Sequence, residues 1–242
     1  MLNAAVMLCA GQSSRMKGTV ADKVLAPLAG QPALIHSLRA FLEAGVVDHF
    51  VFVTRDADQQ AAITAALAPL GLPPTATFYV RGGQERQDSV YNGLHELSLL
   101  VDYVFIHDCA RPLVNPASLR ELLQAVQRDH AAVLAHRVTD TIKQAPARKR
   151  GGLRRLRLRD LRRETLWAME TPQVFARELI IEAYRKLRLE NLRVTDDAAA
   201  VATLHHIVTL VENPFPNPKL THPEDFAYVE LLLQRRVSSA IT

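Results

Sequence analysis

Residues 3–16 read Asn-Ala-Ala-Val-Met-Leu-Cys-Ala-Gly-Gln-Ser-Ser-Arg-Met, and Lys23 follows seven positions after the last of them. The first part, Asn3 to Ala10, is a short apolar run typical of a strand buried on both faces. Gly11 then lets the backbone approach a ligand closely, and the small polar residues after it leave N–H groups free for phosphate oxygens. Arg15 and Lys23 would bring positive charge to such phosphates. The stretch therefore predicts a buried strand that ends in a nucleotide-binding loop.

This loop differs from two better-known phosphate-binding motifs. It lacks the Gly-Lys-Ser/Thr ending of a P-loop, and it lacks the second glycine of the G-x-G-x-x-G fingerprint. A strand followed by glycine and polar residues is also typical of a simple turn. The loop alone leaves both interpretations open, and the rest of the chain has to separate them.

Around this stretch, apolar runs typical of strands alternate with helical patterns. The first half of the chain predicts strands at 3–10, 50–54, 75–80, 103–107 and 131–135, and helices at 32–44, 59–70, 88–100 and 116–130. Later segments predict a helix at 177–189, a short helix after Asp196-Asp197, a strand at 207–211 and a closing helix at 223–237. This alternation favours an α/β fold with a mostly parallel sheet covered by helices.

Three polar segments follow predicted strands, at residues 11–23, 82–89 and 108–112. In open parallel sheets, ligands bind beyond the carboxyl ends of the strands. We therefore expect all three segments to meet at one edge of the sheet. Their convergence is stronger evidence for a ligand site than any one of them alone.

The alternation breaks at about residues 138–161, which we interpret as an arm inserted into one domain spanning 1–242. Residues 138–143 predict an exposed strand. Nine of the sixteen residues from Arg148 to Arg163 are Arg or Lys. Leu156 and Leu158 alternate with arginines there, which indicates a hairpin with one apolar face. An arm with so little core of its own is expected to pack on another surface.

The composition is that of an ordinary globular protein. The chain has 242 residues, of which 48% are hydrophobic and 22% charged, and its formal net charge is +4. Its two cysteines, Cys9 and Cys109, form no disulfide framework and no metal-binding spacing. No segment has the pattern of a signal peptide or a membrane span. We therefore expect a cytoplasmic protein with no membrane association.

Asp108 ends a predicted strand and faces the predicted phosphate loop. A carboxylate there is suited to Mg²⁺, which proteins often bind through one or two carboxylates plus substrate phosphates. Capping of the following turn is the alternative, and Arg15 and Lys23 favour the metal. Arg111, three residues later, would pair with Asp108 or meet a second anionic ligand. Lys219 follows a proline-rich loop and, taken alone, has the pattern of a solvated surface lysine.

The segment from Gly82 to Ser89 has two compatible interpretations. Its glycines permit close approach of a planar base, whose polar edge Ser89 and backbone groups would read. Glu85 and Asp88 also suit the N-terminus of a helix, where negative charge is favoured. No serine stands in a G-x-S-x-G elbow and no other covalent nucleophile is evident, which favours direct displacement at phosphorus.

The motifs, taken in order and spacing, identify the chain as similar to 2-C-methyl-D-erythritol 4-phosphate cytidylyltransferases of the non-mevalonate isoprenoid pathway. The resemblance covers nearly the whole length. It is carried by Ala10-Gly11 to Arg15-Met16, Lys23, Gly82-Gly83-x-Glu85-Arg86-x-Asp88-Ser89-Val90, His107-Asp108-x-Ala110-Arg111-Pro112, Asp140-Thr141-Ile142-Lys143, Thr171-Pro172-Gln173, Thr195-Asp196-Asp197-Ala198 and Lys219-Leu220-Thr221-x-Pro223-Glu224-Asp225. One departure lies at the lysine, where the family usually has Pro-Lys-Gln and this chain has Asp22-Lys23-Val24.

The resemblance implies a Rossmann-like nucleotidyltransferase sheet and a homodimer joined by an extended arm. It implies the reaction of CTP with methylerythritol phosphate to give 4-diphosphocytidyl-2-C-methyl-D-erythritol and pyrophosphate. The catalytic residues that it implies are Arg15, Lys23 and Lys219. Asp108 would bind Mg²⁺, and the nucleotide would be surrounded by Ala10, Gly11, Gly83, Gln84, Ser89 and Asp108. The acceptor phosphate would be held by Arg111, Thr141, Arg163, Thr171 and Lys219, some of them across a dimer interface.

Three other functions compete with this one. Ribitol-5-phosphate cytidylyltransferases have a similar fold and motif set but act on a different polyol phosphate. The basic arm would also suit a nucleic-acid-binding protein, but it lacks aromatic residues for stacking, and a solvated basic surface is the simpler interpretation. A non-catalytic relative is disfavoured because Arg15, Lys23 and Asp108 are all present.

Overall fold

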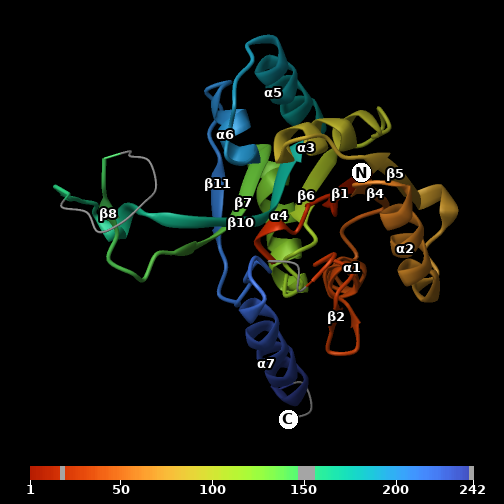
Figure 1. The fold of residues 1–242 in the computed structure, drawn as a ribbon. Coiled ribbons are helices and arrows are strands. Elements are labelled where there is room, and N and C mark those ends of the chain that lie inside the picture. The colour runs from red at the N-terminus through yellow and green to blue at the C-terminus, as the bar shows by residue number, and fades with distance from the viewer. Residues whose placement is uncertain (17–19, 147–155, 240–242) are drawn as a thin grey trace.

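The computed structural model describes residues 1–16, 20–146 and 156–239, and Figure 1 shows their arrangement. The strands are β1 (Asn3–Leu8), β2 (Pro27–Leu28), β3 (Gln31–Pro32), β4 (His49–Thr54), β5 (Thr77–Arg81), β6 (Tyr103–Asp108), β7 (Ala131–Arg137), β8 (Lys143–Gln144), β9 (Arg159–Asp160), β10 (Trp167–Ala176) and β11 (Thr209–Glu212). The helices are α1 (Ala33–Ala44), α2 (Ala57–Leu67), α3 (Arg86–His95), α4 (Pro116–Asp129), α5 (Arg177–Leu189), α6 (Asp197–Ala202) and α7 (Glu224–Ser239). Short 3-10 helices are Ser14–Met16, Ala68–Leu70, Pro74–Ala76 and Arg163–Thr165.

A seven-stranded sheet forms the centre of the molecule. Its strands stand in the order β11-β7-β10-β6-β1-β4-β5. Strand β10 runs antiparallel to both of its neighbours, and the other pairings in this sheet are parallel. The prediction of an α/β fold with a mostly parallel sheet is therefore confirmed.

Helices cover both faces of this sheet, which explains why β1 is apolar at successive positions. Ala5 and Met7 face a core that they share with α1, α2 and α4. Ala4 and Val6 face the opposite core, built with α3, α5 and α6. Burial on both faces is the usual situation of a central strand in such a sheet.

Side-chain capping decides where several helices begin and end. Asp56 accepts a hydrogen bond from the Gln59 backbone N–H at 2.8 Å, so α2 begins two residues before the expected 59. Asp88 likewise accepts from the Glu85 N–H at 3.1 Å, and α3 begins before the expected residue 88. The prediction that α3 reaches residue 100 is wrong. The helix ends at His95, because a turn follows in which Ser98 Oγ accepts from the Leu100 N–H at 3.2 Å.

The predicted arm extends from the body beside β7 and β10 (Figure 1). Its two short strands β8 and β9 pair antiparallel, with Lys143 opposite Asp160, as a hairpin requires. The expected strand over 138–143 is wrong in extent, since β8 begins at Lys143. Much of the arginine-rich stretch, from 148 to 155, lies outside the described residues. Among the described residues of the arm, Leu158 is 55% exposed, whereas Leu156 is half-buried.

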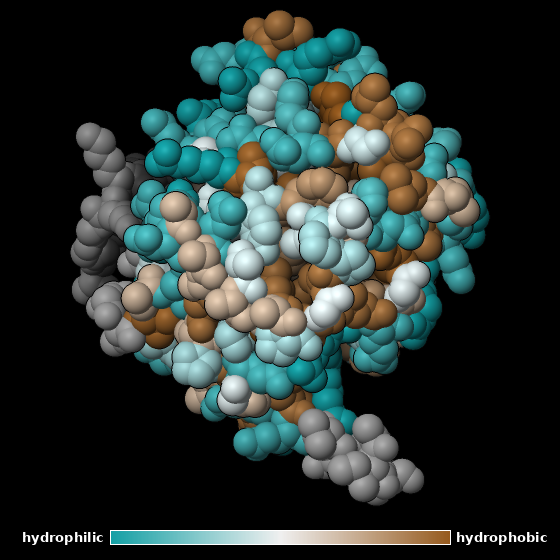
Figure 2. Space-filling model, turned by 90° about the vertical axis from the view of Figure 1, so that its right-hand side faces the viewer, coloured by the Kyte–Doolittle hydropathy of each residue, from teal (hydrophilic) through white to brown (hydrophobic). Residues whose placement is uncertain are grey.

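No helix within the described residues combines the length and the apolar character needed to cross a membrane. Figure 2 turns the right-hand side of Figure 1 toward the viewer. On that face, pale residues of intermediate hydropathy gather in the middle, and hydrophobic residues gather toward the upper right. The face is thus a mixture of polar and apolar areas.

Candidate active site

A cavity of about 630 Å³ opens beyond the carboxyl ends of β1, β4, β5 and β6. The first two polar segments border it, and from the third Asp108 and Ala110 do so. The expected convergence at one sheet edge is therefore confirmed. Among the predicted site residues, those that line the cavity are Ala10, Gly11, Arg15, Lys23, Gly83, Gln84, Ser89, Asp108 and Lys219.

The loop after β5 needs its two glycines for steric reasons. A Cβ on Gly82 would lie 2.6 Å from the Ala10 Cβ, and one on Gly83 would lie 2.2 Å from the Asp88 Cβ. Both distances are shorter than real Cβ contacts allow. The Gly83 N–H also donates to Ser89 Oγ at 3.1 Å, so the start of α3 holds the loop against β1. The loop therefore packs directly against Ala10 and the start of α3, and both Ala10 and the loop border the cavity.

Three cations that line the cavity, Arg15, Lys23 and Lys219, lie close enough to influence one another. Burial lowers the pKa of Lys23, the charges of Lys219 and Arg15 lower it further, and Asp108 opposes the shift. The ammonium end of Lys23 lies close to Gly11, since a Cβ on that glycine would be 3.7 Å from Lys23 Cε. This part of the cavity is therefore electropositive and suited to a polyanion.

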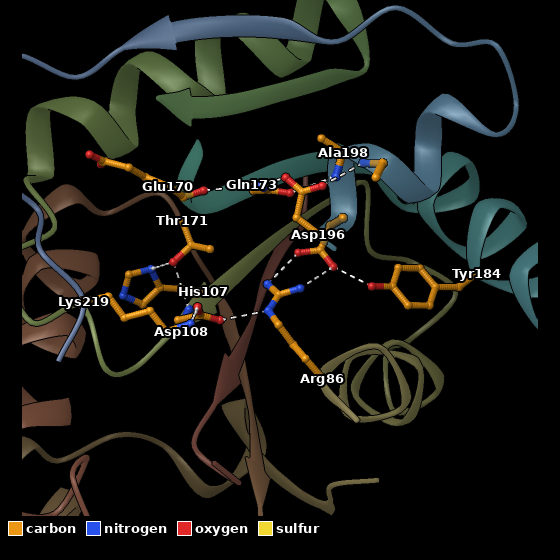
Figure 3. A network of polar contacts seen from close by, with 12 residues as sticks. Arg86, His107, Asp108, Glu170, Thr171, Gln173, Tyr184, Asp196, Ala198 and Lys219 are labelled. Atoms are coloured by element: carbon orange, nitrogen blue, oxygen red, sulfur yellow. Dashed lines mark hydrogen bonds and ion pairs between the residues drawn. The ribbon is translucent and has the colours of Figure 1, made fainter. Parts of the chain in front are cut away.

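Asp108 stands between two cations (Figure 3). Its Oδ1 accepts from Arg86 Nε at 3.2 Å, and its Oδ2 forms an ion pair with Lys219 Nζ. Burial by itself would raise the pKa of Asp108, but the charges of Arg86 and Lys219 outweigh it and hold that pKa well below its usual range. The carboxylate is thus ionised and fixed at the base of the cavity.

Arg86 also forms an ion pair with the fully buried carboxylate of Asp197. Its NH1 and NH2 donate to the two oxygens of Asp197 at 3.1 and 2.8 Å, and the Tyr184 hydroxyl donates to Asp197 Oδ1 at 2.5 Å. Burial opposes the charge of Arg86, but Asp197 and Asp108 raise its pKa well above the usual value. A continuous polar chain therefore runs from Tyr184 to Lys219 (Figure 3).

Thr171 contacts both Asp108 and His107 in the protein interior. Thr171 Oγ1 accepts from the Asp108 backbone N–H at 3.1 Å and lies 3.2 Å from His107 Nδ1. Burial lowers the pKa of His107 to about 3, although the charge of Asp108 opposes the shift, so the ring is neutral. Thr171 is buried and does not line the cavity.

Arg111 also lies outside the cavity lining, in a largely buried position. Its NH1 donates to the backbone oxygen of Asn217 at 2.7 Å, and burial lowers its pKa despite the nearby carboxylates Asp108 and Glu170. The buried Glu170 accepts from the Asn217 side chain at 2.9 Å. This network fixes the loop that delivers Lys219 to Asp108.

Thr141 lies in the arm and Arg163 lies just after it, and neither lines the cavity of its own chain. Both residues are exposed, and Arg163 NH1 donates to the Thr139 backbone oxygen at 2.8 Å. The cavity that the structure describes within one chain is therefore lined by residues predicted to bind the nucleotide, together with Lys219.

Sequence reasoning missed several residues that border the cavity, among them Arg55, Arg81 and Arg86. Arg86 stood inside a recognised motif, but its partners Asp108 and Asp197 are 22 and 111 positions away. The position of Arg55 directly after a predicted strand, at the ligand-binding edge, was the one usable signal for it.

In the part of the chain that the structure describes, two carboxylates line the cavity, the exposed Glu85 and the buried Asp108. Within the described residues, no group of three or more His, Cys, Asp or Glu side chains is placed to hold a metal ion. A cation at Asp108 would therefore need most of its ligands from a bound phosphate group.

The family model described as "IspD: 2-C-methyl-D-erythritol 4-phosphate cytidylyltransferase" matches residues 3–235. A curated protein of that name from Pelotomaculum thermopropionicum is 39% identical over 233 residues, which cover 96% of this chain and 94% of the relative. The crystal structure of a 2-C-methyl-D-erythritol 4-phosphate cytidylyltransferase from Thermus thermophilus is 28% identical and covers 97% of this chain and 100% of its own, with a TM-score of 0.74.

A 4-diphosphocytidyl-2C-methyl-D-erythritol synthase from Anaerococcus prevotii has the same fold, with a TM-score of 0.81 at 23% identity and 96% coverage of both chains. The family match spans both the sheet and the cavity residues. The chain belongs to the 2-C-methyl-D-erythritol 4-phosphate cytidylyltransferase family.

Proposed function

We propose that this chain transfers a cytidylyl group from CTP to 2-C-methyl-D-erythritol 4-phosphate in isoprenoid biosynthesis. A phosphate oxygen of the acceptor attacks the α-phosphorus of CTP, the bond from that phosphorus to the β-phosphate oxygen breaks, and pyrophosphate leaves. Family membership and the grouping of Arg15, Lys23 and Lys219 around Asp108 in one cavity support this reaction. Such transfers depend mainly on positioning and charge stabilisation, which these residues are suited to provide.

The two sides of the cavity have different roles in this proposal. Arg15 and Lys23 bind the triphosphate and stabilise the charge that develops at the α-phosphorus. Cytosine binds in the part of the cavity lined by Ala10 and the Gly83-Gln84 segment, where backbone groups and Ser89 read its polar edge. The cations around Lys23 and the position of Gly83, Gln84 and Ser89 in the lining of the same cavity support this division.

Mg²⁺ is the cofactor that the donor set fits. Asp108 would hold it together with oxygens of the triphosphate, and the ion would neutralise phosphate charge during the transfer. The low pKa of Asp108 keeps its carboxylate ionised and able to bind the ion. In the described structure both oxygens contact cations, so Lys219 would release Oδ2 as the ion and the nucleotide bind.

The acceptor phosphate is assigned to Arg111, Thr171 and Lys219 of one chain and Thr141 and Arg163 of another. This assignment makes the enzyme a homodimer in which an arm completes the neighbouring site. The exposed position of Thr141 and Arg163, outside their own cavity, supports it. We also place the enzyme in the cytoplasm, where a reducing environment would preserve the free thiols of Cys9 and Cys109.

Release of pyrophosphate from CTP, measured with Mg²⁺ and a panel of polyol phosphates, tests the activity. Methylerythritol phosphate should support turnover, whereas ribitol 5-phosphate should not. Lys23→Ala should lower kcat by roughly 100-fold or more, because it removes charge used mainly in the transition state. Lys186→Ala, on α5 outside the cavity, is the matched control and should retain normal kcat. A change confined to KM for CTP in Lys23→Ala would contradict the role of Lys23.

Base choice is tested separately with UTP and ATP as donors. A pocket whose polar groups hydrogen-bond the edge of cytosine leaves those groups without partners when another base binds. The value of kcat/KM should therefore strongly favour CTP. Comparable values for the three nucleotides would refute the assignment of Ser89 and the Gly83 segment to cytosine.

A further inference from the structure

The residue that precedes Lys23 is anchored in the protein interior. The side chain of Asp22 is 11% exposed, and its Oδ2 accepts from Gln59 Nε2 at 2.6 Å and lies 3.4 Å from Arg55 NH1. Its Oδ1 accepts from the Val24 N–H at 3.1 Å. The carboxylate of Asp22 therefore links α2 to the backbone of Val24, the residue that follows Lys23.

Gln59 connects this anchor to the nucleotide loop. The side chain is nearly fully buried, and its Nε2 donates both to Asp22 and to the backbone oxygen of Cys9, the latter at 3.0 Å. Its Oε1 accepts from the Arg55 N–H at 2.6 Å. These partners require one orientation of the amide, with nitrogen toward two acceptors and oxygen toward a donor. Gln59 thereby fixes the position of Asp22 relative to Cys9.

Lys23 needs such an anchor because its surroundings repel it. Lys219 and Arg15 are the nearby cations that lower its pKa. Within the described part of the chain no ion pair joins Lys23 to a carboxylate. Its backbone N–H donates to Ser13 Oγ at 3.2 Å, so the contacts that fix the residue lie in its backbone and in Asp22.

We propose that Asp22 and Gln59 are positioning residues, which hold Lys23 where its charge meets the α-phosphate of the nucleotide. The proposal rests on the role of Lys23 given above. Asp22 fixes the backbone around Lys23, and Gln59 fixes Asp22 relative to the loop that receives the phosphates. Neither residue need touch the substrate, although a shift of about 1 Å in the lysine would be enough to lower the rate by roughly 100-fold.

The hydrogen bond between the two side chains can be reversed, and this gives a specific test. In Asp22→Asn, the single amide oxygen can accept from Gln59 Nε2 or from the Val24 N–H but not from both, so one of the two hydrogen bonds is lost. The value of kcat should fall by roughly 10-fold, the size expected for one lost charge-assisted hydrogen bond. In Gln59→Glu, two carboxylates face each other and the Cys9 oxygen loses its donor, so the fall should be larger, roughly 100-fold. The double variant D22N/Q59E restores an NH₂ group opposite a carboxylate, with the polarity exchanged.

The double variant should therefore have a kcat roughly 10-fold above that of Q59E, instead of the additional loss expected for independent sites. KM for CTP should change by less than about 3-fold throughout, since the lysine acts mainly in the transition state. Gln60→Glu, which makes the same charge change on the exposed side of α2, is the matched control and should behave as the unmodified enzyme. Additive losses in the double variant would overturn the proposal.

The same variants in a Lys23→Ala background separate this proposal from the one on which it rests. If Asp22 and Gln59 act through Lys23, D22N and the double variant should change the residual kcat by less than about 2-fold there. A full loss in that background would show a structural role only. If Q59E does not fold by circular dichroism, Gln59→Met replaces it, and must lower kcat only when Lys23 is present. Normal kcat in Lys23→Ala alone would instead overturn the role of Lys23 itself.

Discussion

Gly82 and Gly11 both border the cavity, but the protein places different demands on them. Around Gly82 the chain itself leaves no room, because an added Cβ would lie 2.6 Å from the Ala10 Cβ and 3.0 Å from Ser89 Oγ. Around Gly11 the nearest atom to an added Cβ is Lys23 Cε at 3.7 Å, an ordinary contact. A requirement for glycine at position 11 would therefore come from a bound nucleotide.

Substitution of each glycine by alanine should separate these demands. Gly82→Ala should lower the free energy of unfolding by about 1–3 kcal/mol, the usual cost of overpacking. Gly11→Ala should leave that free energy within about 0.5 kcal/mol of the original and raise KM for CTP by roughly 10-fold. Denaturant unfolding and CTP titration measure the two effects. Loss of stability in Gly11→Ala without a change in KM would contradict the assignment of this loop to the nucleotide.

The buried His107 predicts a dependence of stability on pH. Its pKa is about 6.5 in the unfolded chain, and burial, opposed by Asp108, lowers it to about 3 in the folded protein. Between these values the unfolded state binds more protons, so the free energy of unfolding falls as pH falls. The slope from this one group is about 1.4 kcal/mol per pH unit. Asp108, whose folded pKa is also depressed, contributes only below its unfolded value of 3.8.

His107→Gln should flatten most of the pH dependence between pH values of about 6 and 4.5, because it removes the most strongly shifted histidine among the described residues. His36, whose pKa burial also lowers, would keep a smaller slope of the same sign. Unfolding in urea at several pH values, in the presence of a chelator, gives the slope. A variant with the original slope over this window would show that another group is responsible.

At the residue scale, sequence reasoning found the cavity residues that stand in motifs close to strand ends. Ala10, Gly83 and Asp108 all lie where they were expected. Lys219, taken from the residues alone, had the pattern of a surface lysine, yet it forms an ion pair with Asp108, 111 positions away. Local patterns carry no information about partners so distant in the chain.

At the scale of the elements, the ion pair between Arg86 and Asp197 joins α3 to α6. Asp197 is fully buried and contacts both Arg86 and Tyr184, so it ties α5 into the same contact. Removal of one partner of a buried ion pair costs more than the pair contributes to stability, and Arg86 would keep only its contact with Asp108.

Asp197→Asn should therefore lower the free energy of unfolding by about 3 kcal/mol. Tyr184→Phe removes one hydrogen bond and should lower it by about 1 kcal/mol. Tyr228→Phe, on the exposed side of α7, is the control and should have no effect. Chemical denaturation of the three variants provides the comparison, and equal stability of Asp197→Asn and the unmodified protein would show that the pair does not hold these helices.

The sequence predicted the elements with clear periodicity better than those without it. The apolar run of β1 and the amphipathic pattern of α4 indicated their type and position. The ends of α3 depended on caps at Asp88 and Ser98, which periodicity does not detect. The antiparallel direction of β10 was not predictable either, because strand order depends on contacts between distant segments.

At the scale of the whole molecule, the proposed dimer requires the arm of one chain to complete the site of another. Deletion of residues 149–159 should weaken dimerisation and raise KM for the acceptor by roughly 10-fold or more. KM for CTP should change by less than about 2-fold, because the residues predicted to bind the nucleotide line a cavity within one chain. Sedimentation of the deletion variant and calorimetric titration with CTP test both statements. A dimeric variant with a normal acceptor KM would show that the arm is only a solvated basic surface.

The place of β10 in the sheet has a consequence for the order of folding. Strands β1, β4, β5 and β6 come from the first 108 residues and can pair with one another as soon as that part of the chain has been synthesised. Strand β7 pairs with none of these four strands. It joins the sheet through β10, which is synthesised later and lies between β6 and β7. Until residues 167–176 emerge from the ribosome, the apolar strand β6 is an open edge that can pair with another nascent chain. Synthesis that slows between residues 108 and 167 would therefore prolong the interval in which this protein is most prone to aggregate.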